Sequence, residues 1–81
     1  MTADEILKEL NNIFIDVLEN DSIILTRETT ANDIEEWDSL THVQIMVAIE
    51  ERFKIRFKSS EIQGYGNVGE MIDGILSKTA Q

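Results

Sequence analysis

The chain has 81 residues, of which 42% are hydrophobic, and its 16 acidic and seven basic residues give a formal net charge of −9. This length supports one hydrophobic core, so we expect a single domain over residues 1–81. The absence of cysteine excludes disulfides, thiolate metal sites and a cysteine nucleophile. The acidic balance argues against nucleic-acid partners, because phosphates are contacted mainly by Lys and Arg, and it favours partners with basic surfaces.

Membrane insertion and secretion are not indicated by the sequence. The first five residues include two acids, Asp4 and Glu5, and no apolar run is long enough for a signal peptide or a membrane-spanning helix. We therefore expect a cytoplasmic protein that makes no membrane contact, and we expect it to be a monomer.

The first predicted element is a helix over residues 3–18. The chain contains no proline, and its four glycines all fall between Gly64 and Gly74, so nothing earlier breaks a helix. Thr2 followed by Glu5 is a capping box. Apolar residues then recur at spacings of three and four, as a helix requires: Ile6, Leu7, Leu10, Ile13, Phe14, Val17 and Leu18.

A long connection over residues 19–37 follows the first helix. Such a length is unusual in a compact domain and is typical of a functional or anchored loop. A strand at residues 22–26 is the alternative, but a single strand would have nothing to pair with. The residues that could anchor the loop are Ile23, Ile24, Leu25, Ile34 and Trp37.

A second helix is predicted from Asp38 or Ser39 to Phe53, with Asp38 as its N-cap. Its apolar residues occupy most of its circumference, which predicts a helix at the centre of a bundle. Residues 33–51 contain acids but no Lys or Arg. The cations that follow are interpreted as charges opposing the dipole at the helix C-terminus rather than as a binding patch: Arg52, Lys54, Arg56 and Lys58.

The last predicted helix opens with Asn67, has Glu70 at the capping-box position and presents Val68, Met71, Ile72, Ile75 and Leu76. Residues 60–63, stopped by Gly64, are expected to form a short extra turn. The fold class is therefore all-α: a small four-helix bundle of three main helices and one short helix, with a long loop between the first two.

Ser39 is the residue with the clearest chemical potential. It lies at the start of the second predicted helix, where its hydroxyl is open and where backbone N–H groups and the helix dipole favour an added phosphate. Capping alone is the structural alternative, because Ser and Asp are both common at helix starts. The surrounding residues decide between the two.

Those residues form a pattern through the second helix: Asp38-Ser39-Leu40, Val43, Ala48-Ile49-Glu50-Glu51, Phe53 and Ile55. This pattern resembles the signature of the acyl carrier protein family. The signature covers residues 35–57, and the match in helical pattern covers nearly the whole chain. Length, acidity and the lack of cysteine also fit a stand-alone carrier.

The resemblance implies that Ser39 is joined to 4′-phosphopantetheine by a separate phosphopantetheinyl transferase. The thiol of that arm would carry acyl intermediates as thioesters to partner enzymes of fatty-acid, polyketide or related biosynthesis, so the chain itself is not an enzyme. Glu36-Trp37 stands where peptidyl carriers usually have Gly-Gly, which favours an acyl or polyketide-like cargo. The Trp-Asp-Ser-Leu-Thr-His form is similar to carriers of specialised pathways.

The same resemblance suggests a partner surface with basic counterparts on acyl-transferring and acyl-modifying enzymes. A solvated helix face is the alternative for its acids. The sequence departs from the family pattern at Thr41, Gln44 and Arg52, which questions recognition by fatty-acid synthase enzymes. The residues assigned to partner binding are Glu36, Asp38, Leu40, Val43, Glu50 and Glu51.

Two further side chains near Ser39 invite a functional interpretation. His42 stands three residues after Ser39, but a Ser-His dyad lacks an orienting carboxylate and an oxyanion hole, so we expect a solvated histidine. Trp37 could staple the helix start, yet its partner position would be His42, so burial in the bundle is favoured.

Three further expectations concern an acyl cleft, a metal site and the pKa values of the acids. Val43, Val47, Ile62 and Met71 either pack in the core or line an acyl cleft, as resembling proteins do. No metal site is predicted, because the acids before Ser39 lack the Asp-x-Asp-x-Asp-Gly ladder of a calcium loop. Crowded acids are expected to have raised folded-state pKa values.

Two other functions are compatible with parts of the sequence. One is an acidic helical adaptor that binds a basic partner without a covalent arm, and the other is a small serine hydrolase. The adaptor is the stronger alternative, because the chain lacks the residues of a hydrolase site.

Overall fold

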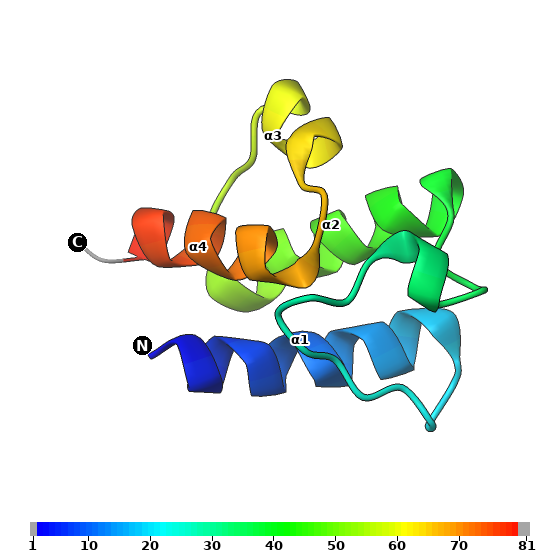
Figure 1. The fold of residues 1–81 in the computed structure, drawn as a ribbon. Helices are drawn as coiled ribbons and strands as arrows, with labels where there is room; N and C mark the ends of the chain where they lie inside the picture. The colour runs from blue at the N-terminus through cyan, green and yellow to red at the C-terminus, as the bar shows by residue number, and fades with distance from the viewer. Residues whose placement is uncertain (1, 80–81) are drawn as a thin grey trace.

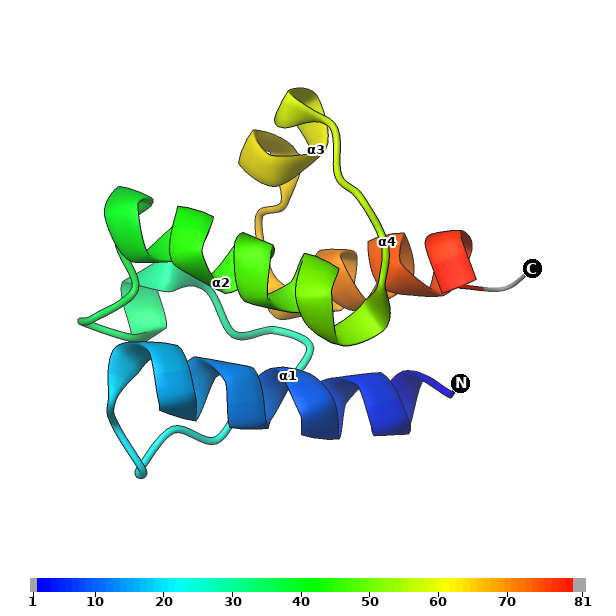
Figure 2. The ribbon, with the colours of Figure 1, turned by 180° about the vertical axis from the view of Figure 1, so that it is seen from behind.

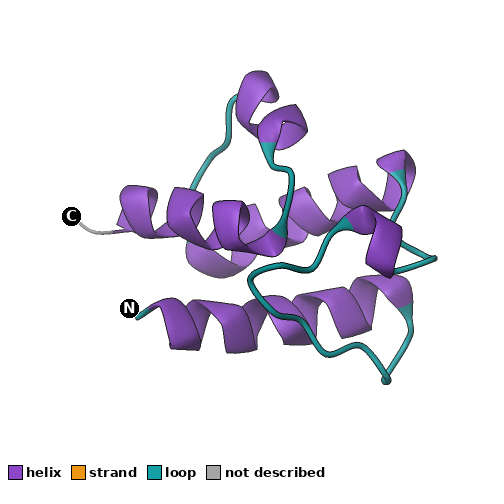
Figure 3. Cartoon of the chain, viewed as in Figure 1, coloured by secondary structure: helices purple, strands orange, loops and turns teal. Residues whose placement is uncertain are grey.

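The computed structural model describes residues 2–79, which form four α-helices and one 3-10 turn joined by loops (Figure 3). No strand occurs among these residues. The strand considered for residues 22–26 is therefore wrong, and the all-α fold class is confirmed. The elements in chain order are α1 (Ala3–Leu18), η1 (Ala31–Asp33), α2 (Ser39–Phe53), α3 (Ser59–Gly64) and α4 (Val68–Thr79).

The first helix has the bounds that the sequence predicts, and both of its ends have local causes. Thr2 Oγ1 accepts the N–H of Glu5 at 3.2 Å, and the Glu5 carboxylate accepts the N–H of Thr2 at 2.8 Å. The helix stops at Glu19, whose left-handed φ of 52° turns the chain away. Its buried residues are Ile6, Leu10, Ile13, Phe14 and Leu18.

α1 makes the most extensive helix–helix contacts. It contacts α2 and α4, while α3 lies on the opposite side of those two helices in both views (Figures 1 and 2). The predicted central place of α2 is met only in part: α2 packs on α1 and meets α3 through His42, but its apolar circumference is only partly covered. Ile45, Met46 and Ile49 are buried, but a stripe along the same helix stays open: Leu40 is 69% exposed, Val43 50% and Val47 47%.

The end of α2 explains part of the basic cluster. Arg52 lies in the last turn and its Nη1 donates to the Glu9 carboxylate of α1 at 2.6 Å. Lys54 is the C-cap in a left-handed conformation, with φ of 56°. These two cations therefore stand at the helix C-terminus, as the dipole interpretation expects.

The long loop is anchored to α1 through alternate residues. Ile23 and Leu25 are buried, whereas Ile24 between them is 84% exposed and is not an anchor as expected. Asn11 of α1 holds this stretch, since its Nδ2 donates to Ile23 O at 3.1 Å and its Oδ1 accepts the N–H of Leu25 at 2.7 Å. One side chain thus satisfies the backbone that a neighbouring strand would otherwise serve.

The same loop also caps α4. The N–H groups of Val68 and Gly69 donate to the carbonyls of Thr29 and Arg27 at 3.0 and 2.8 Å. A Cβ on Gly69 would lie 3.0 Å from Arg27 O, a tight contact that the absence of a side chain on glycine avoids. Asn67 caps as predicted, accepting the N–H of Glu70 at 2.8 Å, but the Glu70 carboxylate accepts from Gly66.

The predicted short turn is confirmed as α3, which is longer by one residue at each end. Glu61 of this helix makes two polar contacts. Its carboxylate accepts the N–H of Lys58 at 2.7 Å and pairs with Lys78 of α4 at 3.0 Å. The rings of Phe57 and Tyr65 meet edge to face, 5.9 Å apart. No residue from 54 to 67 is fully buried.

Candidate functional site

The start of α2 is fixed by Asp38 and Thr41. The Asp38 carboxylate accepts the N–H groups of Leu40 and Thr41 at 3.0 and 2.9 Å. Thr41 Oγ1 in turn accepts the N–H of Asp38 at 2.8 Å and donates to Glu36 O at 2.8 Å. The sequence analysis assigned the cap but missed Thr41. The Asp-x-x-Thr spacing, a capping box with Thr in place of Glu, is the signal that could have found it.

The pKa of Asp38 is lowered because the Thr41 N–H, together with the Thr41 hydroxyl and the Leu40 N–H, stabilises its charged form. Hydrogen bonds from backbone N–H groups likewise lower the pKa values of Glu5 and Glu61. The raised pKa expected for crowded acids is therefore wrong at Asp38, the one of these three carboxyls that lies in the acidic stretch of residues 33–51. Its hydrogen bonds outweigh the effect of desolvation.

Ser39 is the first residue of α2 and is exposed. The N–H groups at the start of the helix donate to the Asp38 carboxylate, so the Ser39 side chain is not the cap. The sequence argument that backbone N–H groups would favour a phosphate here needs correction, because Asp38 already occupies two of them. An accessible hydroxyl with no structural task still fits the covalent attachment of an arm.

A groove of about 510 Å³ begins at Ser39 and runs between α2 and α3. Val43 and Ile62 line it, as the cleft hypothesis expects, whereas Met71 is buried in the core and Val47 lies outside the groove. Its walls are mainly apolar, which suits an aliphatic guest. The lining residues are Ala31, Trp37, Asp38, Ser39, His42, Val43, Ile62, Gln63, Tyr65 and Gly66.

His42 is not the solvated side chain that the sequence predicts. It is half-buried, with Nδ1 3.0 Å from Trp37 Nε1 and Nε2 2.7 Å from Ile62 O. Trp37 is 6% exposed, so its expected burial is confirmed, and its ring meets Phe14 edge to face at 4.8 Å. A hydrophobic staple between Trp37 and His42 was not expected, because a staple needs an apolar contact. The contact between these two residues is instead a hydrogen bond.

The acids assigned to partner binding differ in what they already hold. Glu50 accepts the N–H of Phe57 at 2.8 Å, and Glu36 accepts from Asn20 Nδ2 at 3.0 Å. Asp38 is the helix cap. Glu51 is exposed beside Val47, at the edge of a second hollow near the end of α2.

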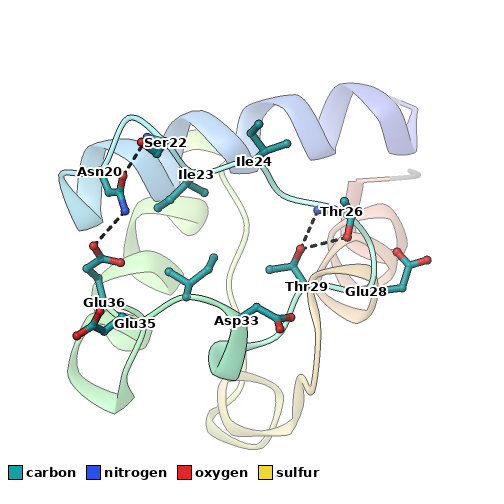
Figure 4. Close-up of a pocket in the computed structure, with 11 residues that line it drawn as sticks. Asn20, Ser22, Ile23, Ile24, Thr26, Glu28, Thr29, Asp33, Glu35 and Glu36 are labelled. Carbon is teal, nitrogen blue, oxygen red and sulfur yellow. Dashed lines mark hydrogen bonds between the residues drawn. The ribbon is translucent and has the colours of Figure 1, made fainter.

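A separate pocket lies along the long loop and does not include Ser39 (Figure 4). Its shape depends on local polar contacts, since Asn20 bonds both Ser22 and Glu36, and Thr29 accepts the N–H of Thr26. The carboxylates around it do not converge. Within residues 2–79 no group of three His, Asp or Glu residues is placed to hold a metal ion.

Comparison with known proteins identifies the family. The sequence model of the family described as "Phosphopantetheine attachment site" matches residues 8–75. The chain is also 30% identical over 79 residues to the acyl carrier protein of Acidothermus cellulolyticus, an alignment that covers 98% of this chain and 94% of that protein. This chain belongs to the acyl carrier protein family.

A solved structure agrees with this assignment. The carrier resembles the solution NMR structure of the holo acyl carrier protein from Geobacter metallireducens, with 47% sequence identity and a TM-score of 0.85. The match covers 91% of this chain and 85% of that one. The chain is thus a non-catalytic acyl carrier that uses covalently attached 4′-phosphopantetheine, which sets aside the adaptor and hydrolase alternatives. No helix among the described residues is long and apolar enough to cross a membrane.

Proposed function

We propose that Ser39 is the attachment residue of this carrier and that acyl groups are presented from there to the enzymes of fatty-acid, polyketide or related biosynthesis. The observation that carries the proposal is the exposed Ser39 hydroxyl at the first turn of α2, beside a groove and with the capping work done by Asp38. The arm supplies the thiol that this cysteine-free chain lacks. The chain's own residues hold the hydroxyl open to a phosphopantetheinyl transferase.

Intact mass spectrometry after incubation with coenzyme A and a broad-specificity phosphopantetheinyl transferase tests the attachment. We expect one arm on the natural chain and none on Ser39→Ala. Ser59→Ala is the matched control, because Ser59 is also exposed and is also the first residue of a helix. A mass gain that survives Ser39→Ala, or one lost in Ser59→Ala, contradicts the assignment.

We further propose that partner enzymes dock on the open stripe of α2, formed by Leu40, Val43 and Val47, with Glu51 meeting a basic residue. Exposed apolar side chains along one helix face are what a recurring docking surface requires. The carboxylates of Glu36, Asp38 and Glu50 each accept a hydrogen bond from a neighbouring group. We therefore expect them to contribute to docking only through the negative charge that they add around the stripe.

The transferase itself can serve as the probe of this surface. Glu51→Lys and Val43→Asp should each raise its KM about tenfold, which corresponds to about 1.4 kcal/mol, with little change in kcat. Asp21→Lys, an exposed acid in the loop, carries the same change in charge as Glu51→Lys and should leave KM within about twofold. Equal effects of the two charge reversals would mean that net charge, not the α2 surface, governs docking.

The cargo and the compartment are part of the same proposal. Glu36-Trp37 ahead of Asp38 supports an acyl or polyketide-like cargo over a peptidyl one. We place the carrier in the cytoplasm as a monomer, with the transferase and acyl-handling enzymes as its partners. Mass analysis of the arm on chain isolated from its own cells would identify the cargo, and an aminoacyl group there would overturn this choice.

A further inference from the structure

His42 joins two segments that meet beside Ser39. Trp37, in the loop that leads to Ser39, points its indole N–H at His42 Nδ1, and Ile62 of α3 points its carbonyl at His42 Nε2. The indole and imidazole planes are 24° apart with ring centres at 5.9 Å, so the two rings lie nearly parallel. All three residues line the groove, so the link ties one of its walls to the other.

The chemistry of these groups selects one state of the histidine. An indole nitrogen can only donate and a carbonyl oxygen can only accept. His42 Nδ1 must therefore be unprotonated and Nε2 must carry the hydrogen, which is the neutral Nε2–H form. A second proton would fall on Nδ1 and would face the Trp37 N–H with another donor. Trp37 is buried, so its N–H would then lack its partner.

We propose that His42 is the positioning residue of the Ser39 groove: its neutral form ties the loop before Ser39 to α3, and a proton added at Nδ1 releases the loop from that tie. The bond to Ile62 survives protonation, because Nε2–H remains a donor. Unperturbed histidine side chains change charge between about pH 5 and 8, so acidification across this range is the condition under which to look for the release.

Three neighbouring groups have pKa values that are shifted away from this range. Asp38, on the loop side, has its pKa lowered by the Thr41 and Leu40 N–H groups. On the α3 side, Glu61 has its pKa lowered by the Lys58 N–H and by Lys78, while burial raises the pKa of Tyr65. A step in the Trp37 indole signal that coincides with a change in the His42 ring signals is therefore assigned to a proton on His42, the chain's one histidine.

The first test uses the unaltered full chain. Long-range ¹H–¹⁵N spectra of the imidazole ring should show the Nε2–H form near pH 8. The indole N–H of Trp37, the chain's one tryptophan, should shift in a single step together with the His42 ring. Its exchange with water, corrected for the intrinsic rate, should be about tenfold faster at the acidic end.

Two variants separate the two bonds. His42→Asn keeps an acceptor at the position of Nδ1, so its indole N–H should stay protected with no pH step, while the amides of α3 lose protection. His42→Gln keeps a donor at the position of Nε2, so α3 should stay protected while the indole N–H exchanges fast at every pH. A merely space-filling histidine would give the same result in both variants.

Three results would overturn the proposal: the Nδ1–H form in the unaltered chain, an indole resonance that ignores the His42 titration, or indistinguishable variants. The ring and indole spectra need no variant, so misfolding of either substitution leaves the test intact. The proposal concerns the fold around Ser39 and not the attached arm. Its failure would therefore leave the mass-spectrometric result on Ser39 untouched.

Discussion

Residues 19–38 and residues 54–67 both connect helices, yet they are held in different ways. The long loop buries Ile23, Leu25 and Trp37, and its backbone is bonded by Asn11 of α1 and by the first N–H groups of α4. The segment around α3 buries no residue fully and relies on one ion pair, one ring contact, partly buried apolar side chains and the His42 bond.

The comparison shows that length alone does not set how firmly a connection is held. A segment opens locally when it buries few apolar side chains and has few backbone bonds to the rest of the fold. The loop is the longer connection, yet its buried side chains belong to the hydrophobic core. The α3 segment forms one wall of the groove beside Ser39. The less firmly held wall is therefore the one that a molecule bound in the groove would contact.

The largest expected difference comes from matched aliphatic truncations in the two segments. Leu25→Ala should lower the free energy of unfolding by about 3 kcal/mol, because it empties a buried site. Ile62→Ala removes a half-buried side chain and should cost about 1 kcal/mol. Urea unfolding followed by circular dichroism measures both. Equal losses would remove the distinction between the segments.

The clamp on the loop should matter nearly as much. Asn11→Ala leaves the Leu25 N–H and the Ile23 carbonyl without their partner and should cost about 2 kcal/mol. Asn12, the exposed neighbour on the same helix, is the control, and Asn12→Ala should cost under about 0.5 kcal/mol. Faster amide exchange at Leu25 in the first variant only would locate the effect. Similar losses in both would point to helix propensity instead.

Two glycines give a test with opposite signs. Gly69→Ala should destabilise by roughly 1 to 2 kcal/mol, because its Cβ would press on the Arg27 carbonyl that caps α4. Gly64→Ala, at the end of α3, meets nothing within 4 Å and should stabilise by about 0.5 kcal/mol through the unfolded chain. Thermal melting distinguishes them, and a neutral Gly69→Ala would show that the loop yields easily.

The smallest effect is expected in acid. Asp38 and Glu61 have lowered folded-state pKa values, so their stabilisation is complete above the unfolded carboxyl pKa of about 4 and is lost as the pH falls through the folded value. Asp38→Asn keeps the cap and should flatten the acid decline of the melting temperature. Glu61→Gln should instead change amide exchange in α3 and leave melting almost unaltered. A global acid effect of Glu61→Gln would place α3 within the cooperative unit.

The sequence was most informative where structure has a local cause. Thr2 with Glu5 sets the start of α1, and Asp38 sets the start of α2, because a cap acts within one turn of its helix. The open stripe of α2 was misjudged, because apolar periodicity shows how wide a face is but not which side a neighbour covers. α1 takes the central place through contacts that are distant in sequence.

The groove could be predicted only in part for the same reason. Ser39 and Val43 follow from their spacing in the chain, but the His42 link needs Ile62, which α3 brings in from 20 residues away. A half-buried histidine and a solvated one look the same in a helical pattern. Ile23, Ile24 and Leu25 look equally suited to anchor the loop, and their alternate burial depends on Asn11 across the loop.

Asp38 has one more consequence, for the freedom of whatever is joined next to it. By taking up the N–H groups of Leu40 and Thr41, its carboxylate leaves a neighbouring anion with neither those donors nor a favourable charge. A helix start whose backbone N–H groups were unpaired would form a phosphate-binding site. Because Asp38 fills these positions, an arm attached at Ser39 as proposed would be held by its covalent bond and not by the N–H groups of Leu40 and Thr41.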